Sequence, residues 1–220
     1  MDLNKFIDHT LLKPTATKED IITLCNEAKT HQFFSVCVNS CYVQLAKKQL
    51  ENTNVKVCSV IGFPLGAMST HAKVEETKDA IKNGADEIDM VINIGLIKSN
   101  DFDAVAQDIK AVKTIMPNTI LKVILETCYL TDSEIIQASE ISINNGADFI
   151  KTSTGFGTAG ATLHHVKLMK QITGNKAKVK ASGGIKNAET AVAFINLGAE
   201  RLGTSSGIAI ISGETSNSNY

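Results

Sequence analysis

The 220-residue chain is predicted to be an α/β protein that folds as a single (β/α)8 TIM barrel, and three observations predict this. Its length falls in the range of roughly 200–250 residues that suits one such barrel. Strand-like apolar runs alternate with amphipathic stretches along the chain. A short run of glycine, alanine and an acidic residue recurs at 84–86, 146–148 and 198–200, each time between a helical pattern and a strand-like run. Glycine after the last helical residue can take the left-handed conformation that ends a helix, so this repeat predicts successive parallel β/α units.

Eight strands and six longer helices follow from this pattern. The strands are expected at 6–10, 35–39, 56–62, 87–93, 121–126, 149–154, 178–182 and 201–205. The helices are expected at 17–30, 70–83, 101–116, 132–145, 161–171 and 187–197. We expect one catalytic domain over residues 1–211 and a flexible polar tail over 212–220, where periodicity is lost. An open doubly wound sheet is disfavoured, because no G-x-G-x-x-G run follows the first strand.

Composition excludes several classes of function. The net charge is −1, which predicts no nucleic-acid binding, and the apolar runs are too short to span a membrane. The N-terminus has no signal-peptide pattern, so a cytoplasmic protein is expected. The five cysteines are odd in number and scattered, which indicates free thiols. Neither a metal nor another cofactor is expected: the five histidines offer only the adjacent pair His164 and His165, which should point to different sides of a helix.

The predicted barrel lumen is unusually polar. Alternation along the strands turns six charged side chains inward, namely Asp8, Asp89, Lys122, Glu126, Lys151 and Lys180. Barrel interiors are normally filled with aliphatic residues, and buried charges are costly unless they are paired. This departure predicts a functional site. For Lys122 and Glu126, a structural role as an internal ion pair and a functional role stay equally open.

Lys151 and Lys180 are the candidates for covalent chemistry. They lie 180 − 151 = 29 residues apart, which is one β/α unit, so they should face the lumen from neighbouring strands. Two ammonium groups held together repel, and one of them then loses its proton more easily. A neutral lysine amine is the nucleophile that forms a Schiff base with a carbonyl. Asp89 on another strand either transfers protons or serves as the counter-ion of a lysine.

Three glycine-rich segments, 153–157, 182–186 and 203–207, follow the last three strands, and the third opens a short helix. Glycines let backbone N–H groups approach an oxyanion, and serine hydroxyls can donate to it. Because the late loops of a barrel commonly hold phosphate, these segments predict a phosphorylated substrate.

Four segments, 7–14, 87–95, 149–155 and 178–185, resemble those of deoxyribose-phosphate aldolases, and matches extend from residue 7 to residue 206. The resemblance implies reversible cleavage of 2-deoxy-D-ribose 5-phosphate to acetaldehyde and D-glyceraldehyde 3-phosphate, in deoxyribonucleoside catabolism and without a cofactor. It implies that Lys151 forms the Schiff base, that Lys180 adjusts the pKa of Lys151, that Asp89 transfers protons and that Asp8 supports the site. It assigns phosphate binding to Gly155, Gly183, Gly184, Gly203, Ser205 and Ser206.

The resemblance bears on two further positions. Members of the family often end in a tyrosine that reaches the site, which suggests Tyr220 as a proton carrier. Some members carry a phosphate-holding lysine after the glycine that matches Gly155, where this chain has Phe156. Phosphate binding then depends on the two later loops, on Lys186, or on no replacement for that lysine, and the preference for phosphorylated over plain substrates stays open to that extent.

Two alternatives remain beside this interpretation. The chain could be another Schiff-base barrel, such as a transaldolase or a ketose-phosphate aldolase. It could also be a non-catalytic barrel that binds a sugar phosphate and regulates a partner. In each case the ligands are small phosphosugars or aldehydes, and a homodimer is expected as the commonest closed assembly.

Overall fold

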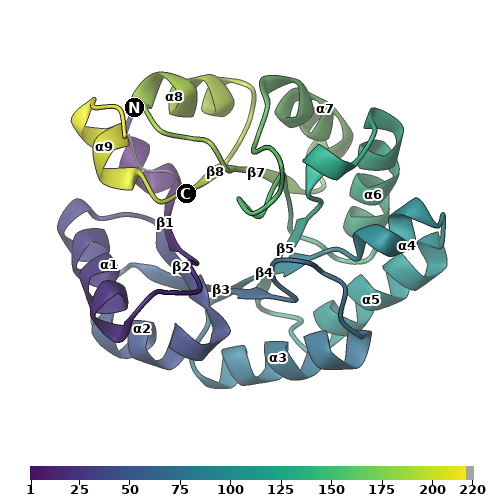
Figure 1. The fold of residues 1–220 in the computed structure, drawn as a ribbon, viewed down its shortest axis with the longest axis horizontal. Coiled ribbons are helices and arrows are strands. Elements are labelled where there is room, and N and C mark those ends of the chain that lie inside the picture. The colour runs from purple at the N-terminus through teal and green to yellow at the C-terminus, as the bar shows by residue number, and fades with distance from the viewer. Residues whose placement is uncertain (217–220) are drawn as a thin grey trace.

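The computed structural model describes residues 1–216, which form a closed barrel of eight parallel strands inside a ring of helices (Figure 1). Each strand pairs with the next along the chain, and β8 pairs with β1. The strands are β1 (Ile7–Leu11), β2 (Ser35–Asn39), β3 (Lys56–Ile61), β4 (Glu87–Val91), β5 (Ile120–Ile124), β6 (Phe149–Lys151), β7 (Lys178–Ser182) and β8 (Arg201–Thr204). The predicted (β/α)8 barrel is confirmed.

The helices follow the strands in order. They are α1 (Lys18–His31), α2 (Val43–Gln49), α3 (Thr70–Lys82), α4 (Ile94–Lys98), α5 (Phe102–Thr114), α6 (Asp132–Asn144), α7 (Leu163–Thr173), α8 (Ala188–Asn196) and α9 (Gly207–Ser212). The six longer helices lie within about two residues of their predicted bounds. The short helices α2 and α4 were not predicted, because five to seven residues give too little periodicity. Among the described residues no helix is long and apolar enough to cross a membrane.

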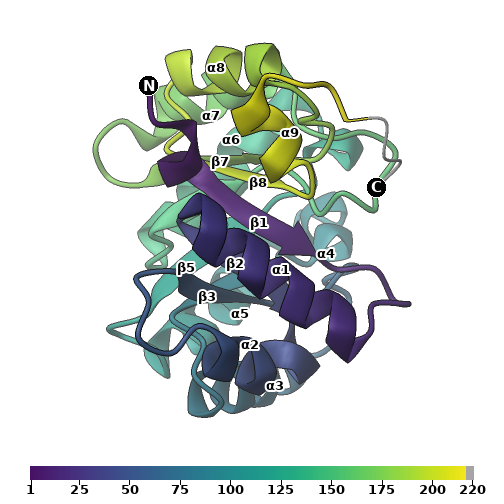
Figure 2. The ribbon, with the colours of Figure 1, turned by 90° about the vertical axis from the view of Figure 1, so that its left-hand side faces the viewer.

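Side chains alternate between the two faces of each strand. On β4, Ile88 and Met90 are fully buried and belong to the apolar core, whereas Glu87 and Asp89 on the opposite face are buried in polar contacts. Viewed from the side, β1 runs diagonally across the molecule between α1 and α9, and both helices contact it (Figure 2). The hydrophobic core therefore fills the layer between strands and helices, and the lumen is left for charged groups.

The recurring glycine-alanine-acid run forms the same joint three times. Gly84, Gly146 and Gly198 have φ values of 105°, 94° and 98°, in the region that favours glycine. In each joint the stem of a lysine from an earlier helix crosses the glycine, so that an added Cβ would lie 2.6–2.9 Å from it. The joint thus needs glycine for conformation and for space.

The acid of each joint ties the helix layer to the sheet. It forms an ion pair with the lysine that crosses the glycine, and it accepts a hydrogen bond from a backbone N–H of the preceding strand. In the three joints, the lysine and the acid are Lys47 and Asp86, Lys113 and Asp148, and Lys170 and Glu200. The backbone donors are Val57 of β3, Leu121 of β5 and Val179 of β7, in the same order. The joints therefore fix β4, β6 and β8 against the strands before them.

Candidate active site

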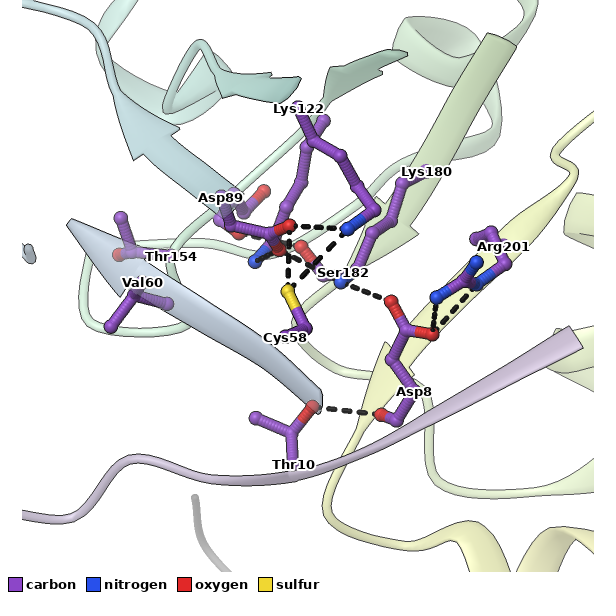
Figure 3. Close-up of polar contacts among 12 residues, drawn as sticks. Asp8, Thr10, Cys58, Val60, Asp89, Lys122, Thr154, Lys180, Ser182 and Arg201 are labelled. Atoms are coloured by element: carbon purple, nitrogen blue, oxygen red, sulfur yellow. Dashed lines mark hydrogen bonds and ion pairs between the residues drawn. The ribbon is translucent and has the colours of Figure 1, made fainter. Parts of the chain in front are cut away.

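Asp89 on β4 is fully buried and holds three lysines from three neighbouring strands. Its Oδ1 accepts from Lys122 of β5 at 2.8 Å, and its Oδ2 accepts from both Lys151 of β6 and Lys180 of β7 at 2.8 Å each. Strand register explains the convergence, because Asp89 pairs with Lys122 and Lys151 pairs with Lys180 as Cα partners. Figure 3 shows Lys122 and Lys180 reaching this carboxylate from different strands.

The charge state of Asp89 follows from two opposed effects. Burial raises the pKa of its carboxyl group, but the positive charges of Lys122, Lys151 and Lys180 together hold that pKa well below its usual value. Asp89 is therefore a stable carboxylate. A carboxylate that shares one oxygen between two ammonium groups keeps those groups close despite their repulsion.

Asp8 on β1 links the cluster to the far side of the barrel. It forms ion pairs with Lys180 and with Arg201 of β8 (Figure 3). Ser35 of β2 also donates to its Oδ1 at 2.7 Å. Burial raises the pKa of Asp8, whereas the charges of Arg201 and Lys180 outweigh it and lower that pKa below its usual range. Asp8 thus holds the second lysine in place, as a supporting acidic residue would.

Arg201 and Glu87 complete a lumen network, although the sequence pattern did not single them out. Arg201 pairs with Glu87 at 2.8 Å and stacks on the Phe34 ring, with 3.5 Å between its guanidinium carbon and the ring centroid. Lys122 also pairs with Glu87 at 2.6 Å. The network contains four cations and three carboxylates, namely Lys122, Lys151, Lys180, Arg201, Asp8, Glu87 and Asp89. With all groups ionised its charge is 4 − 3 = +1.

Lys151 and Lys180 differ in their access to the pocket. Lys180 is fully buried, and although burial lowers its pKa, the charges of Asp8 and Asp89 outweigh burial and raise it above its usual value. Lys151 lines a pocket at the end of the barrel, together with the glycine-rich loops that follow β6, β7 and β8. Gly203 of β8 makes room for Lys180, because an added Cβ would lie 3.1 Å from its Cε. Lys180 thus stays a cation behind Lys151, and Lys151 faces the pocket.

Cys58 on β3 is an unexpected member of the site. Its Sγ lies 3.0 Å from Asp89 Oδ1 and 3.4 Å from Lys122 Nζ (Figure 3). Burial, the contact with Cys37 and the charge of Asp89 raise the pKa of this thiol well above its ordinary value. Cys58 is therefore a neutral thiol that donates a hydrogen bond to the carboxylate. The alternation of side chains along β3 could have placed Cys58 in the lumen from the sequence. In the structure Cys58 pairs with Cys37 of β2 on the lumen face.

Glu126 does not pair with Lys122, which corrects one of the two roles left open for them. It follows β5 at a positive φ of 55° and accepts from the backbone N–H of Thr154 at 3.2 Å and from the hydroxyl of Thr154. Burial raises the pKa of Glu126. The side chain therefore fixes the start of the loop after β6, and Lys122 finds its partners in Asp89 and Glu87 instead.

The late glycine loops line the pocket that Lys151 enters. Five of the six predicted phosphate-binding residues line it, namely Gly155, Gly183, Gly184, Gly203 and Ser205. Ser206 does not, and its backbone N–H already donates to the hydroxyl of Thr204 at 2.9 Å. Lys186 adds a positive charge to the pocket wall. Gly183 has a φ of 83°, and its carbonyl lies so close to Gly160 that an added Cβ there would be 2.3 Å from it.

Phe156 does not line this pocket. It is 41% exposed, and its ring meets that of Phe63 edge to face with 5.3 Å between centroids. Tyr220, which the resemblance suggests as a proton carrier, lies outside the described residues. The pocket therefore brings together Lys151, glycines, serine hydroxyls and Lys186, which suits an aldehyde with an anionic far end.

The prediction that His164 and His165 point apart was wrong. Their ring centroids lie 5.5 Å apart in the first turn of α7, and both approach Asp132 at the start of α6. One ligating atom from each of the three residues lies within 4.8 Å of the other two. Adjacent helical residues diverge at Cβ, but long side chains in a first turn can bend toward the same neighbouring helix.

Comparisons with known proteins agree over the full chain. The family model described as DeoC/LacD family aldolase matches residues 3–213. The deoxyribose-phosphate aldolase of Finegoldia magna is 59% identical over 213 residues, which cover 97% of this chain and 100% of that protein. A putative deoxyribose-phosphate aldolase structure from Coccidioides immitis matches with a TM-score of 0.94 at 45% identity, covering 96% of this chain and 85% of that one. The tetrameric deoxyribose phosphate aldolase of Aeropyrum pernix matches with a TM-score of 0.90 at 33% identity, covering 96% and 89%.

Proposed function

This chain belongs to the DeoC/LacD family of aldolases, and from that premise we propose that it reversibly cleaves 2-deoxy-D-ribose 5-phosphate into D-glyceraldehyde 3-phosphate and acetaldehyde. One observation carries the proposal: Lys151 lines the pocket formed by the late glycine loops, while Lys180 stays buried behind it as a cation. The names of the relatives above support the same substrate.

Lys151 is the nucleophile of the proposed mechanism. Its neutral Nζ attacks C1 of the open-chain sugar, and loss of water gives an iminium ion. Removal of the C3 hydroxyl proton then lets the C2–C3 bond break, so that its electron pair forms an enamine and glyceraldehyde 3-phosphate leaves. Protonation of the enamine carbon and addition of water release acetaldehyde and regenerate the amine.

The proposed mechanism requires one lysine of the lumen network to be a neutral amine. The network carries a charge of +1 with every group ionised, and loss of one proton makes it neutral. Lys180 and Lys122 have raised pKa values and hold their protons. Lys151 is the member that lines the pocket, so we assign the proton loss to it.

Asp89 is proposed to move protons through water. Its pKa is held well below the usual value, which makes it a weak base for direct transfer. Its carboxylate can nevertheless orient a water molecule next to Lys151, which it contacts at 2.8 Å. A water held in this way can take the C3 hydroxyl proton and return one to the enamine carbon. Tyr220 is proposed as a second proton carrier, and Tyr220→Phe with deuterium exchange at the acetaldehyde methyl group tests it.

The pocket loops are proposed to anchor the phosphate. Gly183 and Gly184, with positive φ values, leave their backbone open to an oxyanion, while Ser205 and Lys186 add a hydroxyl and a charge. Gly155 and Gly203 line the same pocket, and Ser206 follows Ser205 directly in the chain. Anchoring the far end fixes the carbonyl carbon against Lys151. Residues 1–211 would form this catalytic domain, with 212–220 as a tail.

Borohydride trapping tests the nucleophile. The folded protein is treated with acetaldehyde and borohydride, and the labelled peptide is mapped by mass spectrometry. An ethyl group on Lys151 supports the proposal, and a label on Lys180 means that the two lysines exchange roles. No label would favour the binding-only barrel, whereas trapping with a ketose phosphate but not with acetaldehyde would favour another Schiff-base aldolase.

The proposal extends to the assembly of the protein and its location in the cell. We propose a homodimer in the cytoplasm that serves deoxyribonucleoside catabolism, although the related aldolase of Aeropyrum pernix is a tetramer. Light scattering after size exclusion at several protein concentrations distinguishes the two assemblies. A single species with four times the mass of the chain would contradict the dimer.

A further inference from the structure

The cluster of Asp132, His164 and His165 lies on the outside of the barrel, between the first turns of α6 and α7, which pack against each other. His164 Nε2 lies 2.7 Å from Asp132 Oδ2. His165 is half-buried, and its Nδ1 is buried without a hydrogen-bond partner among the described residues. None of these residues belongs to the lumen network. We propose that this cluster binds a divalent transition-metal ion such as Zn²⁺.

The separations suit such an ion. Zinc binds imidazole nitrogen and carboxylate oxygen at about 2.0–2.2 Å, which places tetrahedral ligands roughly 3.3 Å from one another. The three ligating atoms already lie within 4.8 Å of one another, and His164 Nε2 lies 2.7 Å from Asp132 Oδ2. The side chains of His164 and Asp132 are 63% and 55% exposed, so they can rotate to adjust these distances without disturbing the core. Water would complete the coordination.

The donor set selects the class of ion. Two imidazoles and one carboxylate form a nitrogen-rich set that favours Zn²⁺, Ni²⁺, Co²⁺ or Cu²⁺ over Mg²⁺ and Ca²⁺, which prefer oxygen ligands. A metal binds the neutral imidazole.

The backbone under the ligands is fixed by helix caps. Thr162 accepts from the backbone N–H of His165 at 3.1 Å, and Thr131 forms a capping box with Glu134 just before Asp132. Glu134 is also held by Lys98 of α4 at 2.7 Å. Both first turns are thus in place before an ion arrives, which lowers the ordering cost of binding. A bound ion would tie α6 to the start of α7, directly after the loop that carries Gly155.

Calorimetric titration of ZnCl₂ into the chelator-treated full chain tests the proposal. We expect one ion per chain, and we expect His164→Ala, His165→Ala and Asp132→Asn each to weaken binding at least tenfold. The matched control is His71→Ala, which removes an exposed histidine beside Glu75 on α3 and should leave the affinity unchanged. All four positions lie outside the lumen, so sugar-phosphate cleavage or retained circular dichroism shows that each variant is folded.

Cobalt spectroscopy distinguishes this site from the cysteines, of which Cys41 is exposed. Co²⁺ bound here should show visible ligand-field bands without sulfur charge-transfer absorption in the near ultraviolet. Zinc should also raise the midpoint of thermal unfolding in the parent protein but not in His165→Ala. Unchanged affinity in the three variants, or cobalt spectra with thiolate absorption that disappear in Cys41→Ser, would overturn the proposal and leave a hydrogen-bonded surface cluster. Neither result bears on the aldolase proposal.

Discussion

Lys151 and Lys180 donate to the same carboxylate oxygen, Asp89 Oδ2, and each nitrogen lies 2.8 Å from it. Two ammonium groups on one oxygen are held closer than their repulsion favours. The arrangement is stable only while the shared carboxylate stays ionised, and proton loss from the lysine that faces the pocket relieves the repulsion.

Lys180→Met should shift the pH dependence of cleavage. The substitution removes the repulsion between two neighbouring ammonium groups, so the acidic limb of the kcat/KM profile should move up by on the order of 1 pH unit. Borohydride trapping at high pH should still label Lys151. A lower rate at every pH with no movement of the limb would show that Lys180 acts only on the geometry.

Asp89→Asn should abolish turnover and weaken the fold. The substitution leaves Lys122, Lys151 and Lys180 facing a neutral amide inside the barrel. Breaking a buried ion pair by removing one partner costs about 3–5 kcal/mol. Urea unfolding measures the loss, with the surface variant Glu75→Gln, whose side chain is 51% exposed, as its control. Equal stability of the two variants would mean that the lysines are compensated elsewhere.

Cys58→Ala should have a smaller effect than Asp89→Asn. It removes one weak donor from Asp89 Oδ1, while Lys122 continues to hold that oxygen. Since a thiol is a weak donor, we expect a loss of about 1 kcal/mol in transition-state stabilisation, or less than about tenfold in kcat/KM. Cys58→Ser should restore most of it. A serine variant as impaired as the alanine variant would indicate that shape, and not the donor, matters here.

Lys186→Ala should separate phosphate binding from chemistry. The residue lines the pocket that Lys151 enters, so its loss should raise KM for the phosphorylated sugar by about 10–100-fold, the range of a hydrogen bond to a charged group. Cleavage of unphosphorylated 2-deoxyribose should be unchanged, and that substrate is the internal control. An equal loss for both substrates would place Lys186 outside the phosphate site.

The lumen network also predicts how stability depends on pH. Asp8 and Asp89 have lowered pKa values, so their contribution is complete above the unfolded-chain value of about 4 and falls as pH drops below it. Lys122 and Lys180 have raised pKa values, so their contribution is complete below about 10.4 and is lost as pH rises beyond it. Urea midpoints should stay level between about pH 5 and 9 as far as these groups are concerned. A maximum confined to a narrower range would implicate other residues.

Strand periodicity predicted the barrel and the lumen face of its charged residues, because alternation decides which side of a sheet a side chain takes. It did not predict which charges meet. Glu126 lies beyond the end of β5 at a positive φ, where alternation no longer applies, so its pairing with Lys122 was only one open possibility. Arg201 meets Asp8 through barrel closure, across 193 positions of sequence. His164 and His165 of α7 both approach Asp132 of the neighbouring helix α6. A helical wheel of α7 alone does not include that neighbour, so it could not predict this arrangement.

The three glycine-alanine-acid joints divide the barrel into locked pairs of strands, β3 with β4, β5 with β6 and β7 with β8. Within residues 1–216 the pair β1 and β2 has no such joint. Gln32, with a φ of 52°, follows α1 in place of the glycine, and two phenylalanines stand where the alanine and the acid would be. Phe34 covers Arg201 of β8 instead. The pair without this joint carries Asp8, and there Ser35 of β2 donates a hydrogen bond to Asp8 of β1 instead. The position of Asp8, which pairs with Lys180, therefore depends on side-chain contacts inside the lumen and not on a joint between helix and strand.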